Sequence, residues 1–416
     1  MEREFEMSNL KRVFFISCLC CAFFSIRMHA AILAEWTVLV YLQADNNLAP
    51  FAEYNIKDMQ GGIYANSSLV NILVQWDQPR NNRTWRYKIV KNGRIEDESL
   101  TSEMGINPGQ EIVTCASWVK RKYPAKKYAF VLWNHGNGFS DARSVDEKDR
   151  GILYDYTQNT FLTNQAMTQA FIQMKAILGH SVDIVGMDAC MMNMIEVAYQ
   201  LRGLVNVMVS SEETEPGYGW AYSGFIRPLT SNPTGFDAKR LAQSIVSSYG
   251  VFYRKIGETD FTQSAFDMAY LNPLKTNIDN MILLVNECKK YKSIQIKNAV
   301  IAARLKTLTF YVSDYVDLYS FYKKFYSQIY TIRRSIKVVS NYTRALDRLK
   351  KVLVQGLTLI NTSVVANAVG ARNIDAHGVS IYFPNPTRPL HIDSTYPLTL
   401  FAQQSKWLSF IKTNRK

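Results

Sequence analysis

Cysteine is scarce in this sequence outside its N-terminal segment. The chain of 416 residues has six cysteines, and only Cys115, Cys190 and Cys288 follow residue 31. Exported domains that depend on disulfides carry a denser and usually even set, so we expect no disulfide framework. Cys115 and Cys288 lie in helical patterns and are expected to be core thiols. Metal motifs are lacking as well, since after residue 31 the chain has no Cys-x-x-Cys, and it has no His-Glu-x-x-His. The sequence therefore predicts no required cofactor or metal.

The apolar run near the N-terminus, residues 13–26, is shorter than the roughly 20 residues of a membrane-spanning helix. It follows Lys11 and Arg12 and precedes small residues, which is typical of a secretory signal peptide. We predict that residues 1–31 are that peptide and that the protein is exported, to a secreted, periplasmic or cell-surface location. The alternatives are an uncleaved anchor and a lipoprotein anchored at Cys18, Cys20 or Cys21.

Positive charge is in excess, and its distribution is uneven. The formal net charge is +13. Between residues 289 and 351, fifteen Lys or Arg stand against three Asp, a balance of +12. This region could face an anionic partner such as nucleic acid, lipid headgroups or cell-surface polymers, or it could consist of solvated helix faces. It lacks the aromatic and basic pattern of a recognised nucleic-acid module, so we expect no specific nucleic acid.

Two short apolar runs each end in a reactive residue. Residues 129–133 lead into Asn134-His135-Gly136, and residues 182–187 lead into Asp188-Ala189-Cys190. Branched and aromatic runs bounded by polar or glycine residues predict buried strands. Parallel strands place functional side chains in the loops at their C-terminal ends. If these strands are neighbours, an imidazole and a thiol meet there, as covalent acyl transfer requires. The alternative is an inert buried thiol and a histidine in an ordinary turn.

Strands alternate with helices along the first half of the chain, which favours an α/β sandwich with a mainly parallel sheet. We predict a core over residues 32–225 and a helical C-terminal region over residues 226–416, whose late strands complete the core. The expected strands are 36–43, 70–76, 84–90, 93–96, 129–133, 182–187, 204–209, 364–367 and 379–383. The expected helices are 51–60, 110–123, 163–178, 191–201, 236–253, 274–291, 294–303, 315–330, 344–354 and 398–412.

The pattern His135-Gly136 and Asp188-Ala189-Cys190 resembles the clostripain-type cysteine peptidases, family C11 of the caspase-like clan CD. Residues 41–48 (YLQADNNL), 210–220 (SSEETEPGYGW), 376–384 (AHGVSIYFP) and 396–411 resemble the same family. The resemblance implies a three-layer α/β/α caspase-hemoglobinase-like sandwich with a helical C-terminal accessory region. It also implies an exported cysteine endopeptidase that cleaves after Arg or Lys and acts on protein or peptide substrates.

The expected catalytic pair is His135 and Cys190. Cys190 precedes a predicted helix, whose N-terminus would favour the thiolate, and His135 would act as base and then as acid. The resemblance implies an oxyanion hole formed by the amides of Gly136 and Cys190. It also assigns Asp188 to the S1 pocket, where a carboxylate can pair with Arg or Lys. The alternative for Asp188 is a structural acceptor for turn amides.

Several other polar residues are weaker candidates. Glu212, Glu213 and Glu215 follow the next strand and could share the role of Asp188. Asp45 follows the first strand, at the edge expected for His135, but a cap for the following helix is the alternative. The remaining histidines after the leader are expected to be structural, because His180 and His377 precede their strands and His391 lies in a loop.

The loop at residues 138–158 is polar and is expected to be exposed. The resemblance implies that the enzyme is a zymogen that cuts itself in this loop after a basic residue, and Lys148 and Arg150 are the candidates. Some relatives depend on calcium, and Asp146, Glu147 and Asp149 could bind it, although no motif indicates this. Two other functions stay open: a clan CD transpeptidase or a peptidase of other P1 specificity, and a non-catalytic basic binding protein on a peptidase scaffold.

Overall fold

The structure is a computed structural model that describes residues 33–65, 67–100, 102–141 and 151–415. The predicted signal peptide, the candidate cleavage residues Lys148 and Arg150 and the acidic residues near them lie outside the described residues. The described residues belong to one unit that begins at Leu33. Within them, no helix has both the length and the apolar character needed to cross a bilayer.

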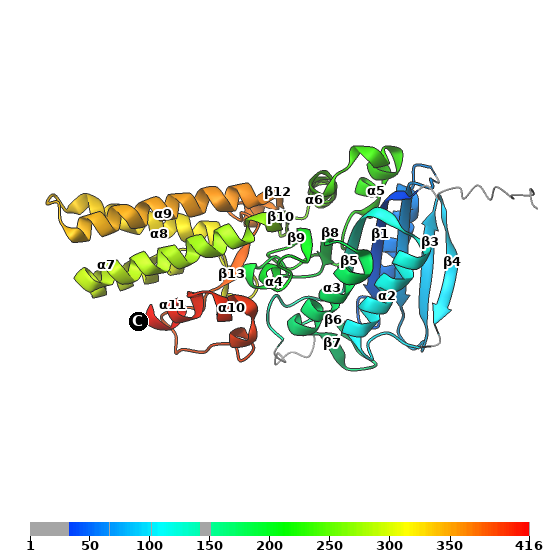
Figure 1. The fold of residues 1–416 in the computed structure, drawn as a ribbon, viewed down its shortest axis with the longest axis horizontal. Helices are drawn as coiled ribbons and strands as arrows, with labels where there is room; N and C mark the ends of the chain where they lie inside the picture. The colour runs from blue at the N-terminus through cyan, green and yellow to red at the C-terminus, as the bar shows by residue number, and fades with distance from the viewer. Residues whose placement is uncertain (1–32, 66, 101, 142–150, 416) are drawn as a thin grey trace, which may run out of the picture. The chain divides into compact units, whose positions relative to one another are not determined.

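Nine strands form one sheet in the order β12-β10-β9-β8-β5-β1-β2-β3-β4 (Figure 1). The five central strands are parallel, and two strands joined by antiparallel pairing extend the sheet at each edge. The predicted α/β fold with a mainly parallel sheet is therefore confirmed. The strand bounds are β1 (Ala34–Gln43), β2 (Val70–Asp77), β3 (Thr84–Val90), β4 (Gly93–Leu100), β5 (Ala125–Trp133), β8 (Val182–Asp188), β9 (Val205–Ser210), β10 (Thr262–Asp267) and β12 (Val364–Val369).

Helices cover both faces of this sheet. Alternate residues of a strand point to opposite faces, so Val38 and Val40 of β1 enter one core while Leu39 and Tyr41 enter the other. The first core packs against α1 (Ala49–Gly62), α5 (Tyr222–Ser231) and α6 (Ala238–Lys255). The second packs against α2 (Pro108–Lys122) and α3 (Asn164–Leu178). The result is the three-layer arrangement that the sequence predicts.

The C-terminal half contributes β10 and β12 to the sheet and three long helices beyond its β12 edge (Figure 1). These helices are α7 (Leu271–Leu305), which has a kink at Lys292, α8 (Leu318–Ser335) and α9 (Asn341–Ser363), and they pack against one another. They carry most of the basic region. The remaining elements are α4 (Ile195–Gln200), α10 (Leu400–Gln404), α11 (Trp407–Thr413), the pair β6 (Ile152–Asp155) and β7 (Thr160–Leu162), and the pair β11 (Tyr315–Asp317) and β13 (Ser380–Tyr382).

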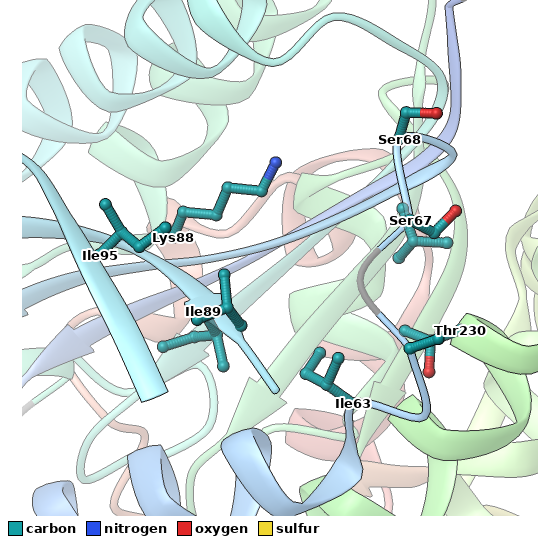
Figure 2. A pocket seen from close by; sticks show the side chains of 10 residues that line it. Ile63, Ser67, Ser68, Lys88, Ile89, Ile95 and Thr230 are labelled. Atoms are coloured by element: carbon teal, nitrogen blue, oxygen red, sulfur yellow. The ribbon is translucent and has the colours of Figure 1, made fainter. Parts of the chain in front are cut away.

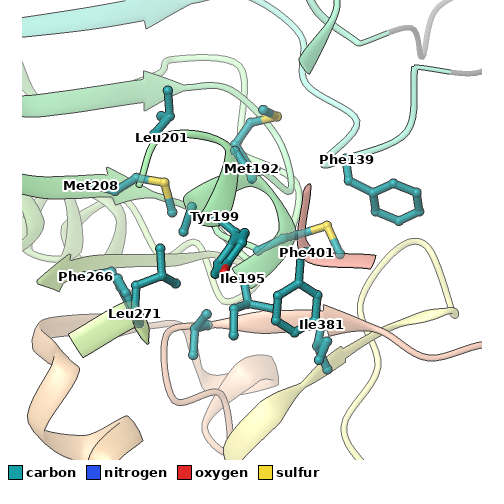
Figure 3. Packing of buried hydrophobic residues seen from close by; sticks show 14 of the residues in the cluster. Phe139, Met192, Ile195, Tyr199, Leu201, Met208, Phe266, Leu271, Ile381 and Phe401 are labelled. Carbon is teal, nitrogen blue, oxygen red and sulfur yellow. The ribbon is translucent and has the colours of Figure 1, made fainter. Parts of the chain in front are cut away.

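The segment that follows Cys190 packs against residues from the C-terminal half of the chain. Met192 and Ile195 belong to one buried apolar cluster with Phe266, Ile381 and Phe401 (Figure 3). Burial of large side chains of this kind contributes about 1.5–3 kcal/mol each. The C-terminal half therefore holds the segment that carries the thiol. The predicted boundary between residues 225 and 226 stays a prediction.

Several local expectations were wrong. The loop expected to be exposed over 138–158 holds the buried strand β6, and the helix expected over 315–330 begins only at Leu318, after β11. The helix expected over 191–201 begins only at Ile195, because the backbone before it pairs with the loop after β9. The strand expected over 379–383 is the short β13, which pairs with β11 instead of joining the main sheet. The closing helix is interrupted between Gln404 and Trp407.

Candidate active site

His135 and Cys190 leave the sheet at the same edge. Strands β5 and β8 are parallel neighbours, with Trp133 opposite Asp188, and the Asn134 amide donates to the Asp188 carbonyl at 3.2 Å. Both residues line one cavity of about 270 Å³. The other residues that line it are Leu48, Trp133, Asn134, Asp188, Ala189, Glu215, Pro216, Gly217 and Gly219. The structure thus brings together the imidazole and the thiol that the sequence pairs.

Gly136 is needed where the two loops meet. A Cβ at this position would overlap the Cys190 carbonyl oxygen and lie 2.9 Å from Cγ of Met192. Any larger residue would push the His135 loop away from the Cys190 loop. The glycine therefore allows close approach of the two loops.

Cys190 does not lie at a helix N-terminus, since α4 starts five residues later. Instead the amide of Glu215 donates to its sulfur at 3.3 Å, and the Met191 amide donates to the Glu213 carbonyl at 3.0 Å. Met191 has a positive φ of 58°, so the chain turns sharply after the thiol. A donor directed at sulfur stabilises negative charge on it. The loop after β9 supplies what the helix was expected to supply.

The His135 ring is oriented by a residue that sequence reasoning missed. Its Nε2 lies 2.6 Å from Oδ1 of Asn47, in the loop between β1 and α1. An amide oxygen can only accept, so a hydrogen bond at this distance requires a proton on Nε2 of the ring. The Asn134 side chain holds the backbone beside it, accepting from the Tyr154 amide at 3.1 Å and donating to the Gln43 carbonyl at 2.7 Å. The sequence signal that could have indicated Asn47 is the polar run of residues 45–47, which follows the first strand.

Asp188 is a buried carboxyl at the base of the cavity, with 4% of its surface exposed. Oδ2 accepts from the Trp220 amide at 3.1 Å and from the Tyr222 hydroxyl at 2.8 Å. Burial raises the pKa of Asp188 to about 6, and these hydrogen bonds oppose a larger rise. A Cβ on Gly219 would lie 3.0 Å from both carboxyl oxygens, so this glycine leaves the carboxyl reachable.

Glu215 is the second carboxyl of the cavity, and both of its carboxyl oxygens are buried. Burial and the neighbouring Asp188 carboxylate raise the pKa of Glu215 well above its usual range. Glu212 and Glu213 lie elsewhere. Glu212 accepts from the Gly378 amide at 2.7 Å, and Glu213 accepts from the Tyr311 amide at 3.0 Å. Of the three glutamates after β9, Glu215 alone lines this cavity.

The remaining candidates lie outside the cavity. Asp45 does not cap α1, which has no side-chain cap, and Asn46 accepts from the amide of Leu48, the residue before the helix, at 2.8 Å. His180 lies before β8, and its Nδ1 is 2.8 Å from the Ser181 carbonyl. The ring of His377 stacks on the ring of Tyr319, with 3.9 Å between the two ring centroids. Cys115 and Cys288 are buried thiols without a disulfide.

A separate hollow of about 380 Å³ lies between the loop after α1 and strands β3 and β4 (Figure 2). Its described lining is mostly apolar, with Ile63, Ile89 and Ile95, and Lys88 is its one charged residue. The lining holds no pair of nucleophile and base. The thiol and the imidazole that the sequence pairs line the cavity at the ends of β5 and β8 instead.

Comparison with known proteins agrees with this geometry. The family model described as the Clostripain family matches residues 40–413. "Clostripain" of Hathewaya histolytica is 25% identical over 407 residues, covering 84% of this chain and 74% of that protein. A secreted C11 cysteine protease of Bacteroides thetaiotaomicron, solved with an irreversible peptide inhibitor, superposes with a TM-score of 0.64 at 18% identity, covering 90% of this chain and 99% of that one. An inactive zymogen C11 protease of Parabacteroides distasonis superposes with a TM-score of 0.58 at 18% identity, covering 92% of this chain and 99% of that one.

Proposed function

The chain belongs to the Clostripain family and is a cysteine endopeptidase, and we propose that it is exported and cleaves after Arg or Lys through His135 and Cys190. The observation that carries this proposal is that one cavity holds the thiol, the imidazole and two buried carboxyls. Protein and peptide chains are the expected substrates. The fold itself is common to many chemistries, so the assignment depends on these side chains.

The proposed reaction begins with transfer of the Cys190 thiol proton to His135. The thiolate attacks the scissile carbonyl carbon, and the oxyanion is bound by the amides of Gly136 and Cys190. Collapse expels the amine, which takes the proton from His135 and leaves a thioester on Cys190. A water molecule, deprotonated by His135, then releases the acid and the thiol. Asn47 serves as a positioning residue that fixes the orientation of the His135 ring.

The specificity proposal rests on Asp188, with Glu215 as its partner. No Lys or Arg of the described residues forms an ion pair with either carboxyl. A cationic P1 side chain would therefore be the partner that the cavity lacks. Arg can bind a carboxylate through two parallel hydrogen bonds, whereas Lys binds as a point charge. The pair would carry close to its full negative charge only when such a side chain is bound.

Self-cleavage and export are further parts of the proposal. Cleavage after Lys148 or Arg150 would create a new N-terminus directly before β6, which begins at Ile152. One similar structure is described as an inactive zymogen and another as a secreted protease. The basic N-terminal segment with its apolar run supports export.

The basic region is proposed to bind an anionic surface. It lies largely on α7, α8 and α9, and the exposed apolar residues Ile294, Val338 and Val339 lie among its charges, with 76%, 73% and 72% of their surfaces accessible. Retention on a heparin column that decreases steeply with salt would support this partner. Elution with a neutral protein at low salt would contradict it.

The central test compares wild type with Cys190→Ala on an Arg-coumarin substrate. We expect the variant to fall to the background rate and to stay a single chain on a gel, while wild type is cut. Cys288→Ala is the matched control, because it removes a buried thiol of α7 and should keep activity and cutting. N-terminal sequencing of the cut wild type should begin at Asp149 or Gly151. Equal activity of wild type and Cys190→Ala would overturn the proposal.

A further inference from the structure

The three long helices of the C-terminal half end in a tip that points away from the sheet (Figure 1). α7 begins at Leu271, shortly after β10, and its last turn is bound close to β13, because the Arg304 guanidinium donates to the Phe383 carbonyl at 2.5 Å. The kink at Lys292 is therefore the far end of α7, and residues 271–291 before it span about 30 Å. The turn between α8 and α9 lies at the same end (Figure 1).

Two contacts join the kink of α7 to the start of α9. The Tyr342 hydroxyl donates to Oε1 of Gln295 at 2.9 Å. The rings of Tyr291 and Tyr342 lie beside each other, with 5.9 Å between their centroids. These contacts hold the two segments together as one surface. We call this surface the arm tip, and it consists of residues 289–297 and 333–344.

Exposed apolar side chains concentrate on the arm tip. Ile294 and Val338, with 76% and 73% of their surfaces accessible, are the two most exposed large apolar residues in the described part of the chain, and Val339 has 72%. Turns usually carry Gly, Pro, Asn, Asp or Ser, which suit turn geometry and water. The turn between α8 and α9 carries the two valines instead. Exposed apolar side chains gathered in one place indicate a surface that another apolar phase covers.

The charge of the arm tip has one sign. Residues 289–297 hold four Lys, residues 333–344 hold three Arg and one Lys, and neither stretch contains Asp or Glu. Two carboxylates border the arm tip and are already paired, Asp347 with Arg333 at 3.0 Å and Glu287 with Arg348. Among the described residues, no carboxylate forms an ion pair with Lys292 or Lys337. The exposed apolar side chains thus stand among cations that the protein itself does not neutralise.

We propose that the arm tip docks on an anionic lipid bilayer, with Ile294, Val338 and Val339 inserted between headgroups whose phosphates bind the surrounding Lys and Arg. Burial of apolar side chains and attraction to anionic lipid add in such interfacial contacts. A sulfated polysaccharide would attract the same cations, but it has no apolar interior to cover the valines. The inference deepens the proposal that the basic region binds an anionic surface, and it rests on that proposal.

Docking of this kind places the protein on the membrane without crossing it. The helices would act as a spacer between the lipid and the sheet, because the arm tip is their far end (Figure 1). The peptidase would then meet protein segments that project from the same membrane.

The test is sedimentation of the exported protein with vesicles of phosphatidylcholine, alone or with added phosphatidylglycerol. Residues 1–31 are left out, because their apolar run would bind lipid by itself. Wild type should bind the anionic vesicles and not the neutral ones. Val338→Ser combined with Val339→Ser should weaken binding by about tenfold or more, because two apolar side chains no longer leave water. Lys337→Gln should weaken it by about fivefold, because one cation is lost.

Matched controls lie outside the arm tip. Ile374→Ser removes an apolar side chain that is 72% exposed, and Lys57→Gln removes an exposed cation of α1. Both control variants should bind anionic vesicles as wild type does. All of these variants should also cleave the Arg-coumarin substrate at the wild-type rate, which shows that they fold.

Retention on heparin distinguishes this inference from the proposal on which it rests. The double valine variant should be retained like wild type, because attraction to a charged polymer depends on the cations. Retention of wild type without binding to anionic vesicles would overturn the inference and leave the anionic-surface proposal standing. Vesicle binding that the double valine variant leaves unchanged would overturn it in the same way. If wild type bound neither heparin nor anionic vesicles, both proposals would be wrong.

Discussion

Two groups of buried carboxyls at one edge of the sheet differ in how a cation can reach them. The pocket pair, Asp188 and Glu215, lines the cavity beside Cys190. The second group, the acidic cluster, is covered by Gln43 and Gln158, which donate to its carboxyls. Its members come from four separate segments: Asp45 after β1, Asp77 at the end of β2, Glu103 before α2 and Asp155 at the end of β6. Both groups bury carboxyls that have no Lys or Arg partner among the described residues. The comparison suggests that an open pair suits a cation that arrives and leaves with each substrate, whereas the covered cluster is closed to a substrate side chain.

The largest effect that separates the two groups is expected from Asp188→Asn. Loss of one partner from a buried charge pair costs about 2–5 kcal/mol, or roughly 30- to 5,000-fold in kcat/KM for an Arg substrate. With citrulline at P1, a neutral isostere of arginine, wild type and variant should be nearly equal. Asp77→Asn is the matched control, since it should change the rates for both substrates by the same factor. An equal loss on both substrates in Asp188→Asn would remove the distinction.

The pH dependence gives the next largest effect. The pKa of Asp188 is raised to about 6 in the free enzyme, so its carboxylate is neutralised as the pH falls through that value. The ratio of kcat/KM for Arg over citrulline should therefore fall, by up to tenfold per pH unit below about 6, and be level above pH 7. The ratio cancels the ionisation of the thiol and the imidazole. A ratio that does not change between pH 5 and 7 would contradict the role of the pocket pair.

Asn47→Ala tests the link between the acidic cluster and the active site, because Asn47 follows Asp45 by two residues and contacts His135. The contact with His135 is neutral and Asn47 is exposed, so a loss of about 1–1.5 kcal/mol is expected, or roughly tenfold in kcat. KM should change little, and the Arg and citrulline substrates should be affected alike. The rate of Cys190 alkylation by iodoacetamide against pH should shift as well, because the imidazole orientation changes. Asn47→Asp, which keeps an acceptor, should restore most of kcat.

The sequence predicts the strands of the central sheet well and its edges poorly. β1, β2, β5 and β8 each contain a short apolar run because their middles are buried on both faces, and the ends of β5 and β8 fix where His135 and Cys190 lie. β10 (TQSAFD) was missed because its polar side chains are buried against tertiary partners, such as Thr262, which accepts from the Glu212 amide at 2.9 Å. The pattern of apolar and polar residues along a strand does not indicate such tertiary partners.

The same limit applies to the candidate site. A thiol and an imidazole after two neighbouring strands can be recognised from spacing, because strand order determines where they meet. The contact of Asn47 with His135 and the acidic cluster cannot be recognised from spacing, because their members come from segments that only folding brings together. The predicted helix after Cys190 also failed for a tertiary reason: the Asn193 amide donates to the Ser211 carbonyl at 2.8 Å, which holds the chain extended before α4.

The smallest expected effect concerns buried acids that belong to neither group. Burial raises the pKa of both Cys115 and Cys288 to about 12, so these thiols stay neutral at pH 7 and cost little to bury. Removing either thiol should therefore change kcat/KM by less than about twofold. In native protein treated with iodoacetamide, peptide mass spectrometry should find Cys190 labelled far faster than the other two. Equal labelling of Cys115 and Cys190 would mean that neither the cavity nor the donor from Glu215 distinguishes the reactive thiol from an inert one.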